Sequence, residues 1–154
     1  MALVHEFLLI DESEYRKHDP IDLYKYTKVN IENVIILDDD FFGYIADSLK
    51  WIPTYDPFRH EDMMGFNYWG ISVLHKESMN KFIPIITSWR DLFQVGPETI
   101  NLRGEFSWTA DDIESGQYKQ LHYERDALIK NLEQFIWFGQ RVKEQNYVIV
   151  YFGI

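Results

Sequence analysis

The side chains best suited to chemistry in this chain lie in two short acidic segments of its first half. They are Asp38, Asp39, Asp40, His60, Glu61 and Asp62. Carboxylate oxygens suit hard cations and imidazole suits zinc or iron, so these residues raise the question of a metal site. Adjacent aspartates point in different directions, however, and the spacing fits neither an EF-hand nor an HExxH motif. We expect the aspartates to cap a helix and His60–Asp62 to lie in a solvated loop, with metal binding as the alternative.

Acid–base or nucleophilic catalysis is a second type of chemistry to consider. The chain has five histidines, and each can in principle pair in space with a carboxylate. It has no cysteine to act as a nucleophile and no G-x-S-x-G serine elbow. His75 stands out because it lies between a predicted strand and a predicted helix, where site residues are common. A surface or capping role is the more usual one for such a histidine.

Glycine-rich phosphate-binding motifs are missing from the sequence. It contains neither a Walker A segment nor G-x-G-x-x-G. Gly65 and Gly70 flank the first part of a predicted strand instead of a turn before a helix. This arrangement does not form a phosphate cradle. Nucleotide binding is therefore not expected.

Charge and composition exclude several classes of protein. The formal net charge is −10, and residues 1–62 hold 14 acidic residues against 6 lysines and arginines. Direct nucleic-acid binding requires a basic surface and is therefore not expected. No apolar run reaches the roughly 18 residues of a membrane span, and the lack of cysteine excludes disulfides. We expect a cytoplasmic protein without a membrane anchor.

The acidic first part of the chain also carries large aromatic side chains. These are Tyr15, Tyr24, Tyr26, Trp51, Tyr55 and Phe58. Tyrosine and tryptophan anchor protein interfaces because they bury a large rigid area and keep a polar end. An acidic surface with such rings would suit a basic protein partner. The alternative is that most of these rings complete the core of a domain rich in aromatic residues.

Hydrophobic periodicity predicts the elements that position these residues. The predicted strands are Leu3–Ile10, Asn33–Leu37, Phe66–Leu74 and Thr99–Trp108. One predicted helix follows the aspartate run and ends before Pro53, and a second runs from Ser78 to Gln94. Thr54–Gly65 is expected to be a loop.

The C-terminal part, Tyr118–Ile154, is predicted to form a long amphipathic helix followed by a central strand from Tyr147. Arg125 falls within the apolar stripe of this helix. We expect it either to reach the rim of the core or to pair with a carboxylate from elsewhere in the fold. Trp137 falls opposite the stripe, which indicates that a second layer or a partner covers it.

These elements favour one α+β domain spanning residues 1–154. We expect a mixed sheet of about five strands, with about three helices packed mainly on one face. The half-polar strand Thr99–Trp108 suits an edge or antiparallel position. The alternative is a three-layer α/β fold with a parallel sheet, which strict alternation of strands and helices would give.

The functional hypothesis that follows is a non-enzymatic binding protein without a cofactor. Its character is that of a bacterial inhibitor or immunity-like protein that recognises a basic protein through the acidic surface of residues 11–62. The residues expected to contact this partner are Asp38, Asp39, Asp40, Tyr55, Phe58, His60, Glu61, Asp62 and Trp137.

Two alternatives remain open at this point. The first is a small metal-dependent hydrolase that uses His60–Asp62 with His75. The second is a ligand sensor with an aromatic-lined pocket near Trp69, Trp89 and Trp108.

Overall fold

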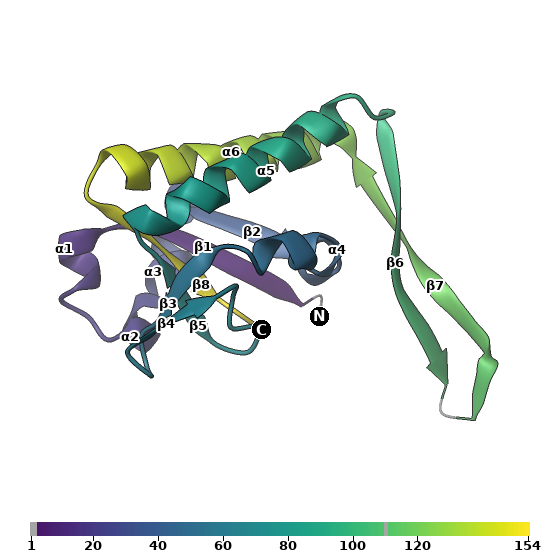
Figure 1. Cartoon of the computed structure of the whole chain (residues 1–154), viewed down its shortest axis with the longest axis horizontal. Helices are drawn as coiled ribbons and strands as arrows, with labels where there is room; N and C mark the ends of the chain where they lie inside the picture. The colour runs from purple at the N-terminus through teal and green to yellow at the C-terminus, as the bar shows by residue number, and fades with distance from the viewer. Residues whose placement is uncertain (1–2, 110) are drawn as a thin grey trace.

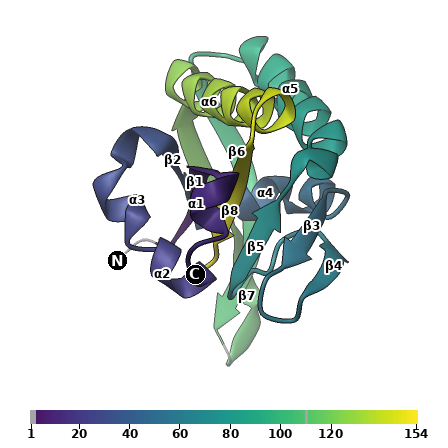
Figure 2. The ribbon, with the colours of Figure 1, turned by 90° about the vertical axis from the view of Figure 1, so that its left-hand side faces the viewer.

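The main sheet joins strands that are far apart in the sequence. The computed structural model describes residues 3–109 and 111–154. Within these ranges six strands form one antiparallel sheet in the order β2-β1-β8-β5-β3-β4 (Figures 1 and 2). The strands are β1 (Val4–Asp11), β2 (Val34–Asp38), β3 (Pro53–Asp56), β4 (Glu61–Met64), β5 (Ile71–Leu74) and β8 (Tyr147–Phe152).

The prediction of an α+β fold is confirmed, but the prediction of a mixed sheet is wrong, because the six strands are all antiparallel to their neighbours. A single helix between two strands would have returned the chain in the same direction. Between β5 and β8 the chain instead passes through α5 (Met79–Gln94) and α6 (Arg125–Glu144), which pack side by side and run in opposite directions (Figure 1). The chain therefore re-enters the sheet antiparallel, which also rules out the three-layer parallel alternative.

Strand β8 occupies the centre of the sheet, as its apolar sequence predicts. It pairs with β1 on one side, where Tyr151 faces Phe7, and with β5 on the other, where Val150 faces Val73. Five of its six residues are buried, because both faces of the sheet are covered at this position. A strand that is apolar on both faces is stable only in such a place.

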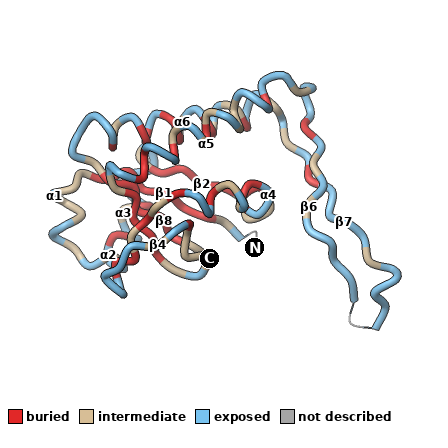
Figure 3. The backbone as a smooth tube through the Cα atoms, viewed as in Figure 1, coloured by how far each residue is buried: buried red, intermediate tan, exposed pale blue. Residues whose placement is uncertain are grey.

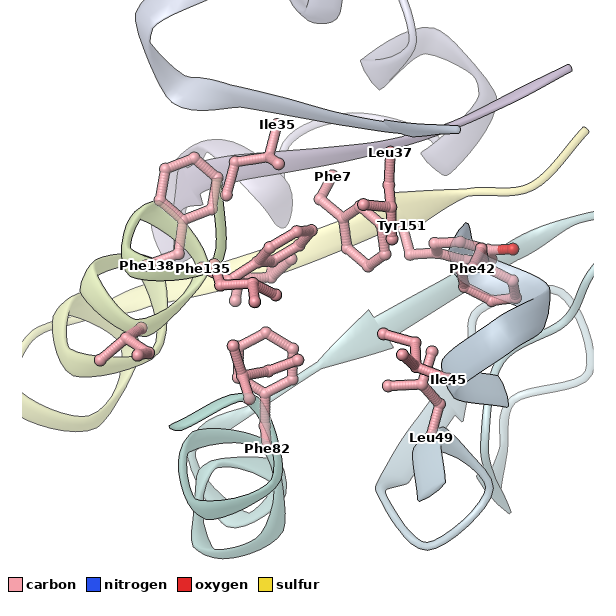
Figure 4. Packing of buried hydrophobic residues seen from close by; sticks show 14 of the residues in the cluster. Phe7, Ile35, Leu37, Phe42, Ile45, Leu49, Phe82, Phe135, Phe138 and Tyr151 are labelled. Carbon is pink, nitrogen blue, oxygen red and sulfur yellow. The ribbon is translucent and has the colours of Figure 1, made fainter. Parts of the chain in front are cut away.

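One face of the sheet packs against the three long helices α4 (Asp39–Leu49), α5 and α6. Figure 4 shows how side chains from these helices meet those of β1, β2 and β8. The labelled members of this core are Phe7, Ile35, Leu37, Phe42, Ile45, Leu49, Phe82, Phe135, Phe138 and Tyr151. In the described part of the chain none of these helices is both long enough and apolar enough to span a membrane.

The opposite face of the sheet carries a smaller cluster. Short helical turns follow β1 there, and Leu23 from one of them is fully buried against the sheet. These turns are α1 (Glu12–Tyr15), α2 (Pro20–Leu23), α3 (Tyr26–Val29) and the 3-10 turn η1 (Ile31–Asn33). A second 3-10 turn, η2 (Lys76–Ser78), leads into α5. This face is only partly covered, since Ile36 at the edge of the sheet is exposed.

A long two-stranded ribbon stands apart from the main sheet. It consists of β6 (Thr99–Thr109) and β7 (Asp112–Glu124), inserted between α5 and α6. Figure 1 shows the ribbon projecting away from the body, and most of its outer part is exposed in Figure 3. The strand Thr99–Trp108 is thus confirmed, but it lies outside the main sheet.

The predicted helix start at Tyr118 is wrong. Helix α6 begins at Arg125, and the side chain of Glu124 caps it by accepting two hydrogen bonds from backbone N–H groups of the first turn. Tyr118 and Leu121 fit a helical wheel, but they belong to β7, where Leu121 faces Leu102. The alternating strand β6 required a partner, and β7 satisfies its backbone groups.

The predicted loop Thr54–Gly65 contains the hairpin β3–β4. The carboxylate of Asp56 accepts hydrogen bonds from the backbone N–H groups of Phe58 and Arg59 at 2.9 and 3.0 Å, which fixes the turn. His60 adopts a positive φ of 55° within it. Hydrophobic periodicity did not predict this hairpin, because β4 is a polar edge strand with little buried surface.

Candidate functional site

The aspartate run begins helix α4, as predicted. The Asp38 side chain accepts a hydrogen bond of 3.0 Å from the backbone N–H of Phe41, which is the arrangement of a helix N-cap. The same oxygen accepts a second hydrogen bond of 2.7 Å from the hydroxyl of Tyr123 at the base of the ribbon. Asp38 therefore joins α4 to β7 in addition to capping the helix.

Asp39 lies at the centre of a partly buried polar network. Its Oδ1 atom accepts hydrogen bonds from His5 Nε2 at 3.0 Å and from the Tyr68 hydroxyl at 2.5 Å. The other ring nitrogen of His5, Nδ1, lies 2.8 Å from the hydroxyl of Tyr151. The imidazole is fully buried and stacks on Phe42, with 3.9 Å between the ring centroids.

The contacts fix the tautomer of the neutral His5 imidazole. A carboxylate can only accept, so Nε2 carries the proton shared with Asp39, and Nδ1 accepts from Tyr151. Burial lowers the pKa of His5, although the hydrogen bond and charge of Asp39 oppose this effect. Burial raises the pKa of Asp39, but the hydrogen bonds from Tyr68 and His5 outweigh it, so the pKa is lowered overall. At neutral pH the pair is a neutral imidazole and a carboxylate.

The third aspartate completes the attachment of the ribbon. Lys119 Nζ of β7 lies 2.7 Å from Oδ2 of Asp40. Between α4 and the ribbon there is a hollow of about 350 Å³. Its lining residues are Asp39, Asp40, Gly43, Tyr44, Tyr68, Arg103, Gly104 and Glu105. The aspartates at its wall already have partners from the chain itself, so the cluster acts as a clamp between body and ribbon.

The His60–Asp62 segment lies far from the aspartate run in the sheet. It leads into β4, one edge of the sheet, whereas the aspartates follow β2, the other edge. The hydroxyl of Tyr55 lies 3.3 Å from Nδ1 of His60, and Arg59 lies 3.6 Å from Glu61. Among the described residues no three His, Asp or Glu side chains are placed to hold a metal ion. The structure therefore does not assemble the set of ligands considered from the sequence.

His75 lies beside the β3–β4 hairpin rather than in a catalytic arrangement. Its ring packs edge-on against Tyr15 and Tyr55, with centroid distances of 6.1 and 5.9 Å. Burial lowers the pKa of His75, which keeps the imidazole neutral at pH 7. It lines a hollow of about 430 Å³ together with Tyr55 and Asp62.

The aromatic residues of the acidic region divide into two groups. Tyr15, Tyr26 and Tyr55 pack against the smaller cluster of the sheet, as the core alternative predicts. Tyr24, Trp51 and Phe58 are exposed, as a contact surface requires. The structure thus places Phe58 where a partner can reach it and uses Tyr55 mainly for packing.

The three tryptophans proposed for a ligand pocket do not converge. Trp89 donates a hydrogen bond of 2.9 Å to Ser48 and lines a shallow hollow between α4 and α5. Trp69 borders a different hollow at the other side of the sheet, and Trp108 lies on the ribbon. The pocket expected from the sequence is therefore not formed by these residues.

Arg125 and Trp137 do not fit the amphipathic pattern of the C-terminal helix, and the structure shows the surroundings of both. Arg125 is the first residue of α6, where its side chain pairs with Asp126 at 3.0 Å and donates to the carbonyl of Gly96 at 3.0 Å. Trp137 is 45% exposed, with the Arg141 guanidinium 5.6 Å from its ring centroid. Its coverage by a partner stays a prediction.

Sequence reasoning missed the outer ribbon, which we define as residues 104–118. Large apolar side chains are exposed on it, namely Phe106, Trp108, Ile113 and Tyr118. The ring of Phe106 packs against those of Trp108 and Tyr118, at 5.9 and 5.1 Å between centroids. The outer ribbon also holds four acidic residues and no lysine or arginine. Aromatic residues recurring along an otherwise polar alternating strand were the signal for it.

Comparison of the chain with protein-family models, with curated proteins and with solved structures found no match.

Proposed function

We propose that the protein is a non-enzymatic cytoplasmic binding protein, of the inhibitor or immunity-like kind, that recognises a basic protein partner through the outer ribbon. The observation that carries this proposal is a projecting ribbon with exposed aromatic rings among acidic residues. Exposed clusters of large apolar side chains on a soluble domain commonly mark interaction sites. Acidic residues around them favour a partner of positive charge.

Each part of the outer ribbon supplies a different element of recognition. The rings of Phe106, Trp108 and Tyr118 provide rigid apolar area that a partner can bury. The acidic residues speed association and disfavour acidic competitors. Both strands are edge strands of a two-stranded sheet, so their outward backbone groups can also pair with a strand of the partner.

The base of the ribbon is attached firmly enough to present this surface in a defined orientation. Tyr123 and Lys119 bond to Asp38 and Asp40, as described above. Leu121 is buried, and Tyr123 packs edge-on against Phe41 with 5.5 Å between ring centroids. A preorganised arm loses less conformational entropy on binding than a free loop.

The acidic surface of residues 11–62 takes a supporting role in this proposal. Asp38 and Asp40 bond to Tyr123 and Lys119 of the ribbon, so they hold it instead of contacting the partner directly. Asp39 is likewise engaged within the chain, by Tyr68 and His5. Phe58 and Trp51 stay exposed and are available for a second contact. The remaining acids of this region add to the negative field that attracts a basic partner.

A capture experiment with two surface variants tests the proposal. Lysate of the source cells is passed over the immobilised protein at low salt, and bound proteins are eluted at about 1 M NaCl, where the Debye length is only about 3 Å. We expect Trp108→Ala to lose the basic protein that the wild type captures, whereas the control Leu92→Ala, which removes an exposed side chain of α5, should still capture it. Capture that survives Trp108→Ala, or that salt does not release, would contradict the proposal.

A further inference from the structure

A hollow of about 530 Å³ lies on the partly covered face of the sheet, away from the ribbon and the long helices. Its wall is formed by the starts of β1 and β5, the end of β8 and the short helix α2. Most of its lining is apolar or aromatic. The lining residues are Leu3, Val4, Glu6, Ile21, Tyr24, Trp69, Gly70, Ile71, Phe152, Gly153 and Ile154.

Glu6 is the one acidic side chain in this lining, and it is only 6% exposed. Its Oε1 atom accepts a hydrogen bond of 2.7 Å from Lys28 Nζ. Its Oε2 atom is buried and has no hydrogen-bond partner among the described residues. A buried carboxylate oxygen without a donor is costly, and such atoms in native proteins call for an explanation.

The same corner of the fold already holds one ammonium group. Lys28 Nζ lies 4.7 Å from the ring centroid of Tyr24 while it bonds to Glu6. A carboxylate beside an aromatic face is the arrangement that recognises organic cations. Trp69, which is 75% exposed at the rim, offers a second aromatic face that Lys28 does not occupy.

From these observations we infer that the hollow binds a primary ammonium group carried on an apolar stem. The ammonium donates to Oε2 of Glu6, and the stem lies against Trp69 and the apolar wall. Ile21 is 66% exposed, and in this proposal its side chain turns outward to admit the group while Trp69 stays against the stem. An anion is disfavoured, because Glu6 can only accept hydrogen bonds and carries negative charge.

This inference is independent of the proposed function, because the hollow and the outer ribbon share no residue. The same ligand chemistry is offered by a free alkylamine and by the side chain of a lysine in another protein. Both carry an ammonium that is charged at pH 7, since its pKa is about 10.4.

The test is a titration of the wild-type protein with n-pentylammonium chloride. The indole N–H signals of the five tryptophans are followed by two-dimensional ¹H–¹⁵N NMR, with the Trp69 signal assigned from Trp69→Phe. We expect the Trp69 signal to shift saturably with pentylammonium and to respond at least about tenfold more weakly to 1-pentanol, which has the same stem without the charge. An unperturbed Trp69 signal, or equal binding of 1-pentanol, would overturn the inference.

Two variants test the role of the carboxylate. Glu6→Gln keeps an acceptor for Lys28 but removes the charge, so we expect it to bind pentylammonium at least about tenfold more weakly. The matched control Glu32→Gln changes an exposed acid elsewhere and leaves the affinity unchanged. Equal affinity in Glu6→Gln would refute the inference. If Glu6→Gln does not fold, Trp69→Ala takes its place, and undiminished binding in that variant overturns the inference.

A parallel titration with Nα-acetyl-lysine N-methylamide separates the two sources of the ammonium group. Binding comparable to that of pentylammonium assigns the hollow to a lysine side chain. Selective binding of pentylammonium assigns it to a free alkylamine. Both results support an ammonium site, whereas binding of neither compound overturns it.

Discussion

The hydroxyl of Tyr151 can be removed with little change in shape, so its contribution can be predicted in some detail. It donates the 2.8 Å hydrogen bond to Nδ1 of His5, and both side chains are fully buried. Tyr151→Phe keeps the ring contacts with Phe7 and Phe66, whose centroids lie 5.1 and 4.8 Å away. The variant therefore isolates the loss of one buried donor.

His5 has no simple way to compensate for this loss. Its Nε2 proton is held by Asp39, so the tautomer cannot change without breaking that hydrogen bond. A buried acceptor left without a donor costs about 1–3 kcal/mol. We expect Tyr151→Phe to lower the free energy of unfolding by about 2 kcal/mol, which corresponds to a fall in Tm of roughly 4–8 °C for a chain of this length.

Urea denaturation at pH 7.5, followed by circular dichroism, measures this effect. Tyr118→Phe is the matched control, because it removes a hydroxyl from an exposed ring on the ribbon and should change stability by less than about 0.5 kcal/mol. The reasoning is refuted if the two variants have the same stability.

A double-mutant cycle makes the test stricter. In a His5→Leu background the Tyr151 hydroxyl is itself left without its acceptor. Removing it by Tyr151→Phe should then cost nothing or even stabilise the protein. A cost as large as in the wild type would show that the hydroxyl acts through some other contact.

Three further outcomes are expected. Burial holds the pKa of His5 and His75 below the ordinary 6.5, so the unfolded chain takes up protons first as the pH falls. The free energy of unfolding should therefore be full above about pH 6.5 and decrease as the pH falls from about 6.5 to 5.5, with a smaller decrease in His5→Leu. A flat profile would contradict this. Leu132→Ala leaves a cavity at a fully buried position of α6 and should lower the free energy of unfolding, measured by urea denaturation, by about 2–5 kcal/mol. A loss below about 1 kcal/mol would contradict this and would indicate that the surrounding side chains close the cavity. Gly153→Ala places a methyl group 2.1 Å from the Tyr68 carbonyl oxygen and should lower Tm by several degrees, which unchanged melting would disprove.

Local signals in the sequence were sufficient for some elements. The aspartates before an apolar helical pattern predicted the start of α4, because capping depends only on residues within one turn. The apolar run from Tyr147 predicted a central strand, because only a doubly covered position suits such a run. The direction of the strands and the ribbon depended on how distant segments meet, and hydrophobic periodicity carries no such information.

The polar network illustrates the same limit for the candidate site. His5, Asp39, Tyr68 and Tyr151 come from four separate segments, and no spacing between them in the sequence announces their contact. Charge counting placed the aspartates on the surface, whereas the fold uses them to hold β7 and a buried imidazole. The aromatic residues Phe106 and Trp108 do alternate along β6 in the sequence. The partner strand β7 was missed because Tyr118 also fits a helical wheel and was assigned to the following helix.

The central position of β8 has a consequence for how fast the protein folds. His5 and Tyr151, which bond to each other in the core, are 146 residues apart in sequence. The ribbon and the β3–β4 hairpin need only local contacts and can form within about 1–10 microseconds. The sheet cannot close until β8 is inserted between β1 and β5, and such distant pairing typically limits folding to milliseconds or seconds. Until then β1 and β5 present unpaired apolar edges, so the partly folded chain is the form most prone to aggregate.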